Sequence, residues 1–220
     1  NADFFNEDRN DILWNYGSTP GFIGATPPMG NIGKMNNRGY EVQVTYADRY
    51  GDFFYSIGAG ASYSVNKILY MDEPENPYYW MNRTGYSYGQ YKGYHIDGFY
   101  NNNEEAMNRP YITTDGNKVQ AGDIRYIDLN GDGIIDSKDV APIGYSNLPR
   151  YTFNGNLTLG YKGFLISALF TGAAQGSMPI ASHYMLNPFY MQTGSAQGFH
   201  YDGRWTPEKA ASGEKITWPR

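Results

Sequence analysis

The 220-residue chain contains no cysteine, and this absence removes several kinds of chemistry at once. Without a thiol the chain cannot form a disulfide, cannot bind zinc through thiolates and cannot use a cysteine nucleophile. Histidine is also scarce, and the spacing of His95, His183 and His200 fits no metal-binding or catalytic motif. We find no catalytic constellation and predict that the chain is not an enzyme.

Charge is scarce as well. Charged residues make up 18% of the sequence, whereas about a quarter is usual. The net charge of -5 argues against a nucleic-acid partner. There is no run of eighteen apolar residues, so no membrane helix is predicted. The first residues do not resemble a signal peptide, and we expect them to be mid-chain sequence.

Tyrosine and glycine are abundant instead, with 22 and 27 copies, and several segments alternate between apolar and small polar residues. From Phe53 to Val65, for example, every second residue is apolar and the residues between are mainly Ser and Gly. A period of two is typical of strands with one apolar face. We predict five strands, at about residues 2–9, 34–47, 52–66, 150–161 and 163–173.

The connections between these strands are strongly asymmetric. Tight turns are expected near residues 49 and 162, whereas the other connections are long, at about residues 10–33, 67–149 and 172–220. Short turns at one end and long loops at the other are typical of outer-membrane barrels, and aromatic residues gather near the predicted tight turns. The fold class predicted is therefore all-β, as part of a large antiparallel transmembrane barrel with short periplasmic turns and long extracellular loops. A soluble β-sandwich alternates in the same way and remains the alternative.

A twelve-residue segment from Asp128 to Asp139 has the spacing of a calcium loop. Oxygen side chains fall at positions 1, 3, 5, 9 and 12, and Gly133 at position 6 permits a sharp turn. The position-12 residue is Asp where an EF-hand prefers Glu. One short helical turn, from Asp136 to about Val140, is expected after the loop. The predicted ligands of a structural Ca²⁺ are Asp128, Asn130, Asp132, the carbonyl of Ile134, Asp136 and Asp139. The alternative is an Asx-rich turn without a metal.

Aromatic residues are dense in the second and third long loops. Their rings could stack on sugars, or they could pack inside a large loop that needs a core of its own. The candidates for ligand or partner contact are Tyr78, Tyr79, Trp80, Tyr86, Tyr88, Tyr91, Tyr94, His183 and Tyr184.

Several motifs occur in the order found in one transporter family. Residues 31–41 resemble the "NIGxxxNxGxE" strand entry of SusC/RagA-type TonB-dependent outer-membrane transporters. Residues 122–136 resemble the family's "GDxxxxDxNGDGxID" loop, residues 143–151 a strand entry that begins "IGxxxP", and residues 161–164 its "YKGF" hairpin. The resemblance extends from about residue 3 to residue 218.

The resemblance implies a 22-stranded barrel with an N-terminal plug, located in the outer membrane of a Gram-negative bacterium. It further implies a SusD-like surface lipoprotein as partner, energy from the TonB complex, and import of oligosaccharides or peptides. This chain would form a late part of the barrel, without the plug and closing strands, and is not expected to fold alone because open edges leave backbone groups unpaired in lipid. The alternative function is a soluble extracellular calcium-stabilised β-module that binds glycans.

Overall fold

The computed structural model describes residues 1–19, 24, 27–112, 119–180, 188 and 195–220. It contains two compact units. The first comprises Asn1–Tyr91 and Gly144–Ser177, and the second comprises Lys92–Ile143 and Met178–Arg220. No helix in the described ranges is long and apolar enough to cross a membrane.

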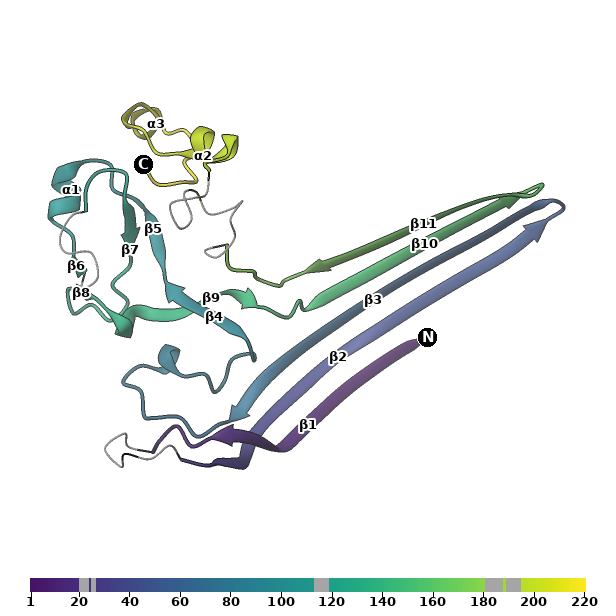
Figure 1. The fold of residues 1–220 in the computed structure, drawn as a ribbon, viewed down its shortest axis with the longest axis horizontal. Coiled ribbons are helices and arrows are strands. Elements are labelled where there is room, and N and C mark those ends of the chain that lie inside the picture. Colours follow the sequence, from purple (N-terminus) through teal and green to yellow (C-terminus); the bar gives the residue numbers. More distant parts are fainter. Residues whose placement is uncertain (20–23, 25–26, 113–118, 181–187, 189–194) are drawn as a thin grey trace. The chain divides into compact units, whose positions relative to one another are not determined.

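A five-stranded antiparallel sheet dominates the first unit, in the order β1-β2-β3-β10-β11 (Figure 1). The long strands alternate in direction, and β3 pairs directly with β10 although a long stretch of chain separates them. The strands are β1 (Ala2–Asn15), β2 (Met29–Tyr50), β3 (Phe53–Tyr70), β10 (Tyr151–Tyr161) and β11 (Phe164–Ala174).

One face of this sheet is apolar from strand to strand. The register places Val44 beside Ala59, and Ala59 beside Gly155, so apolar positions form rows across the strands. Aromatic rows lie at both ends of this apolar face. One consists of Phe4, Tyr40, Tyr63 and Tyr151, and the other of Tyr50, Phe53, Tyr161 and Phe164. Large side chains between the rows are exposed, including Val44, Ile57, Ile166 and Phe170.

The opposite face is mainly polar, although Leu165 and Leu169 of β11 also lie on it. Ser62 and Thr152 share a hydrogen bond of 2.6 Å between their hydroxyls, and Thr158 and Ser167 share another of 3.2 Å. Glycine is required at Gly39, where a Cβ atom would collide with the Tyr63 carbonyl oxygen on the neighbouring strand. The alternation read from the sequence therefore corresponds to a sheet with one apolar and one polar face.

The strands extend beyond their predicted ends. β1 continues to Asn15 and β2 already begins at Met29, so the predicted loop at residues 10–33 was too long. The reason is an irregularity near Asp11, which has a positive φ of 56° and interrupts the pairing register. A bulge of this kind breaks the period of two on which the prediction rested. β3 similarly continues to Tyr70 rather than ending near residue 66.

Both tight turns are confirmed. Tyr50 pairs with Phe53 and Tyr161 pairs with Phe164, so each turn has two central residues. Lys162 and Gly163 have φ values of 45° and 86°, as in the turn type whose twist matches that of the flanking strands.

The predicted loop at residues 67–149 contains secondary structure of its own. Its elements, including β9 at its end, are η2 (Tyr79–Met81), β4 (Gln90–Tyr94), β5 (Ile96–Phe99), α1 (Asn103–Met107), β6 (Tyr111–Ile112), β7 (Ile124–Tyr126), β8 (Ile134–Ile135), η3 (Ser137–Asp139) and β9 (Val140–Ser146). The last part of the chain forms α2 (Gly198–Gly203) and α3 (Pro207–Ser212). The second unit has a buried core, formed by Tyr100, Ala106, Ile112, Ile135, Ala141 and Trp205.

Candidate metal loop and aromatic segments

The predicted calcium loop lies in the second unit, between β7 and β9. Its middle forms β8, which pairs in parallel with β6. The short helical turn expected after the loop is confirmed as η3, which is capped by the Asp136 side chain.

The first half of the loop is a series of turns closed by its own side chains. The Asp128 carboxylate accepts hydrogen bonds from the Gly131 and Gly133 amides at 2.7 and 2.8 Å. The Asn130 Oδ1 atom accepts from the Asp132 amide at 2.9 Å, and the Asp132 Oδ1 atom accepts from the Ile134 amide at 2.9 Å. Both glycines have positive φ values, which glycine adopts without steric cost. These contacts hold the chain in the curvature that the spacing predicted.

Lys138 supplies a cation to the same loop. Its ammonium group lies 3.2 Å from the Asp132 Oδ2 atom and 3.6 Å from the Asp136 Oδ2 atom. The hydrogen bond to Asp132 is the main reason why the pKa of Lys138 is raised. The pKa of Asp132 is lowered, first by the hydrogen bond from the Asn130 side chain and also by Lys138. The sequence interpretation did not include Lys138, although its position between two acidic residues was a signal for this ion pair.

Asp139 is completely buried, and its carboxylate ties the two ends of the loop together. One oxygen accepts hydrogen bonds from the Leu129 amide at 2.8 Å and the Asn130 amide at 3.4 Å. The other oxygen accepts from the Asp136 amide at 2.9 Å. Both oxygens of the predicted closing ligand are therefore already bound by backbone N–H groups.

The donor chemistry of the loop suits calcium, because the predicted ligands are oxygen atoms. Each carboxylate has about four lone-pair sites, so a hydrogen bond to the backbone leaves capacity for a cation. Within the described part of the chain, however, no three His, Asp or Glu side chains converge in a metal-holding group. The calcium site remains a prediction, to which Lys138 is the competing cation.

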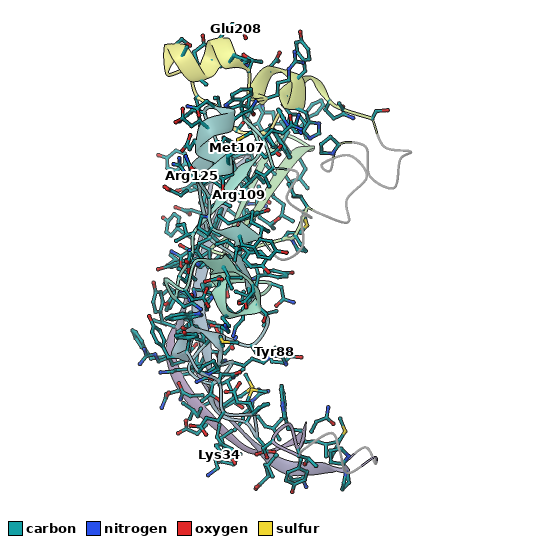
Figure 2. All side chains as sticks on the ribbon, turned by 90° about the vertical axis from the view of Figure 1, so that its left-hand side faces the viewer. Lys34, Tyr88, Met107, Arg109, Arg125 and Glu208 are labelled. Atoms are coloured by element: carbon teal, nitrogen blue, oxygen red, sulfur yellow. The ribbon has the colours of Figure 1, made fainter. Side chains whose placement is uncertain are left out.

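The aromatic candidates of the first unit make contacts with one another. The rings of Tyr78 and Trp80 stack at 4.7 Å with an interplanar angle of 6°, and Tyr79 meets the edge of Trp80 at 5.2 Å. Tyr79 is 75% exposed, and Tyr88, labelled in Figure 2, is 49% exposed. Tyr86 and Tyr91 are half-buried.

Tyr94 lies in the second unit, where its ring packs against Tyr126 at 5.4 Å. These contacts are internal packing, one of the two roles that the sequence left open, and ligand contact remains a prediction. The last two candidates, His183 and Tyr184, lie outside the described residues. In the last part of the chain, the buried His200 side chain meets the edge of the Trp218 ring, with ring centroids 4.4 Å apart.

Comparison with known proteins identifies what the chain resembles. No family model matches it. It is 25% identical over 191 residues to TonB-dependent receptor P3 of Formosa agariphila, and 26% identical over 224 residues to TonB-dependent receptor P26 of the same organism. The chain resembles part of a TonB-dependent receptor. These matches cover 80% and 95% of the chain but only 18% and 21% of the receptors, so the chain spans about a fifth of their length.

Solved structures show the same fold. A structure of the RagAB peptide transporter has a TM-score of 0.64 and 15% sequence identity, and the match covers the whole chain and 24% of that chain. The RagAB peptide importer in its "open-open" state has a TM-score of 0.55 and 18% sequence identity, and the match covers 80% of this chain and 18% of that chain. The predicted resemblance and the predicted antiparallel barrel fold are confirmed, and the partial coverage fits one section of a longer barrel.

Proposed function

We propose that the protein to which this chain belongs is an outer-membrane, TonB-dependent importer of oligosaccharides or peptides that works with a SusD-like lipoprotein. The observation that carries the proposal is the apolar face of the five-stranded sheet, which is exposed and bounded by an aromatic row at each end. The similarity to TonB-dependent receptors and to the RagAB fold supports it.

The spacing of the two aromatic rows supports a membrane-spanning role. Tyr40 and Tyr50 are ten residues apart on β2, or about 33 Å along the strand at the usual rise. A strand tilted by about 45° would place the two rows about 23 Å apart along the membrane normal. Outer-membrane barrels have an apolar band about 25 Å tall with aromatic residues at both borders. The apolar face is therefore the right height for contact with outer-membrane lipid.

The polar face would then line the interior of the barrel. Its Ser, Thr and Asn side chains suit a water-filled lumen, because hydroxyl and amide groups exchange hydrogen bonds with water and with polar cargo. Import through such an interior requires binding and movement but no bond chemistry. Energy from the TonB complex would enter through parts of the protein outside this chain.

The connections that contain η2, α1, α2 and α3 would form the extracellular surface that meets the lipoprotein and incoming ligand. Their exposed aromatic side chains, such as Tyr79 and Tyr88, support this role because such side chains bury much area at little entropic cost. The Asp128–Asp139 loop would hold a structural Ca²⁺, and the Ca²⁺ ion would displace the Lys138 ammonium group from Asp132 and Asp136. The metal would stabilise this surface and take no part in transport.

The test uses the full-length protein in its native cell. Uptake of fluorescently labelled oligosaccharides and peptides should disappear when the gene is deleted, and also when TonB is deleted in cells that retain the protein. A SusD-like lipoprotein should co-purify with the protein in mild detergent. Uptake that continues without TonB would contradict the proposal. A chain that purifies without detergent as a soluble glycan-binding monomer would favour the alternative module.

A further inference from the structure

A cavity of about 480 Å³ lies in the first unit, where β1, β2 and β3 meet the segments around Tyr88 and Arg150. Its volume is within the range of about 300–1,000 Å³ typical of small-molecule sites. Asn37 and Asn66 are cross-strand partners in its wall and lie on the polar face of the sheet. The cavity is therefore on the side that the proposed function assigns to the barrel interior.

The charged residues of this cavity are all positive. Arg9 and Arg150 line it, and its lining includes no Asp or Glu. This composition stands out in a chain whose net charge is -5. Arg9 is partly neutralised, because its guanidinium group makes two hydrogen bonds of 2.8 and 3.2 Å to the Glu7 carboxylate.

Arg150 has no such partner. Among the described residues its guanidinium group donates no hydrogen bond, and its Nε atom is shielded from solvent. The guanidinium carbon lies 5.2 Å from the centroid of the Tyr145 ring. The Nε atom is not accessible to a ligand, but the Nη groups are not shielded in this way and donate to no acceptor among the described residues. At the wall of a cavity, these donors are arranged to receive an acceptor from a ligand.

A neutral hydrogen-bond donor lies in the same wall. The Asn66 Oδ1 atom accepts a hydrogen bond of 2.6 Å from the Tyr88 backbone amide. Because only the oxygen of an Asn side chain can accept, this contact assigns the orientation of the amide and leaves the Nδ2 group as a donor. The cavity thus combines a cation and an amide donor, a set that favours an anionic acceptor.

Part of the wall is aromatic. Trp14 and Tyr88 meet edge to face, with ring centroids 6.3 Å apart and an interplanar angle of 82°. Rings in this position can cover the apolar part of a ligand whose charged group binds Arg150.

Hydrogen bonds hold the walls in place without a ligand. The buried Ser87 hydroxyl donates to the Asn66 carbonyl at 2.8 Å, and the buried Ser146 hydroxyl donates to the Leu148 carbonyl at 2.9 Å. The Asn147 amide donates to the Gly89 carbonyl at 3.1 Å, which joins the two segments that close the cavity. Preorganisation of this kind lowers the entropic cost of binding.

We propose that this cavity is a binding site for a carboxylate group of the imported ligand, with Arg150 as the charged anchor and Asn66 as the second donor. The inference rests on the proposed function, because a carboxylate is the anionic group carried by the two cargo classes, peptides and acidic oligosaccharides. A peptide carboxyl terminus and a uronic acid present the same planar group, and a guanidinium fork binds it through two parallel hydrogen bonds.

The experiment measures binding to the purified full-length protein in detergent by isothermal titration calorimetry. Two pairs of probes differ in whether they carry a charged carboxylate, namely N-acetyltrialanine and its neutral C-terminal amide, and trigalacturonic acid and its neutral methyl ester. At least one acid should bind about tenfold or more tightly than its neutral partner, the effect expected of a charge-assisted hydrogen bond. The pair that shows this preference identifies the source of the carboxylate.

Two variants test the residues, and a third is the matched control. Arg150→Gln should reduce the preference for the acid to less than about threefold, since the charged donor is lost. Asn66→Asp keeps the acceptor for the Tyr88 amide but adds a negative charge, and it should abolish the preference even if Arg150→Gln does not fold. Arg49→Gln removes another arginine that lies over an aromatic ring, 5.8 Å from the Phe54 ring centroid and next to a tight turn, and should leave the preference unchanged.

Equal binding of acid and neutral probes by the unmodified protein would overturn the inference, as would failure of both acids to bind at millimolar concentration. A preference that survives both cavity variants would overturn it as well. The assay needs neither TonB nor transport. An acid preference in a protein that supports no uptake would therefore refute the proposed function and leave the binding site established.

Discussion

Replacement of Asp139 is the sharpest test of how the Asp128–Asp139 loop is held. The buried carboxylate accepts hydrogen bonds from the Leu129, Asn130 and Asp136 amides. Asp139→Ala removes all three, whereas Asp139→Asn keeps one accepting oxygen and turns an N–H donor toward the other side. Hydrogen bonds to a charged group contribute about 1.5–3 kcal/mol each. We expect local opening of the loop to become easier by about 2 kcal/mol for Asn and about 4 kcal/mol for Ala, since the 3.4 Å contact with Asn130 is weak.

Hydrogen exchange measured by mass spectrometry on the full-length protein reports this opening directly. Peptides that cover residues 124–140 should exchange roughly 30-fold faster in Asp139→Asn and roughly 700-fold faster in Asp139→Ala. Asp202→Asn, which replaces an exposed carboxylate, is the control and should leave exchange unchanged. Unchanged exchange in the Ala variant, or equal effects of Asn and Ala, would refute the assignment of the three amide contacts. The same measurement with added calcium and with a chelator distinguishes the effect of the Asp139 hydrogen bonds from the effect of metal binding.

Three further predictions concern the loop and the sheet. Because the Asn130 hydrogen bond lowers the pKa of Asp132, the ionised carboxylate contributes stability above about pH 3.9, and that contribution is lost as pH falls through the lowered pKa. Loop protection against protease should therefore be constant from pH 5 to pH 8 and fall below about pH 4, and loss near pH 6 would contradict the assignment. Ala59→Arg on the apolar face should destabilise the full-length protein in lipid by about 2–4 kcal/mol, and Ser62→Arg on the polar face by less. Equal losses on folding into vesicles would contradict a membrane-facing sheet. Gly39→Ala should destabilise the sheet by about 1–3 kcal/mol through overpacking, and an unchanged unfolding transition would show that the close approach is absent.

Much of the sheet could be read from the sequence because its signal is local. Alternation over ten or more residues, as from Phe53 to Val65, reveals a strand and the composition of its two faces without knowledge of its neighbours. The two-residue turn at Lys162 and Gly163 is equally local, because it depends on the backbone freedom of adjacent residues. Where a bulge near Asp11 interrupts the alternation, the prediction ended β1 too early.

The curvature of the Asp128–Asp139 loop was also evident, since its hydrogen bonds join residues two to five positions apart. The role of Asp139 was not. Spacing predicted a metal ligand, which stays a prediction, but it did not predict that the carboxylate is buried and accepts hydrogen bonds from three backbone amides. Burial depends on what packs around the loop, and a linear pattern of oxygen-bearing residues carries no information about it.

By itself, then, the sequence determined the strands, their apolar and polar faces, the tight turns and the shape of one loop. Each of these depends on residues close together in the chain, where stereochemistry alone limits the choices. Only the tertiary structure decided that β3 pairs with β10, and that Arg9, Asn66, Tyr88 and Arg150 line a common cavity. These contacts join residues that are far apart in the chain. They depend on the strand register and on the loop contacts that bring those segments together.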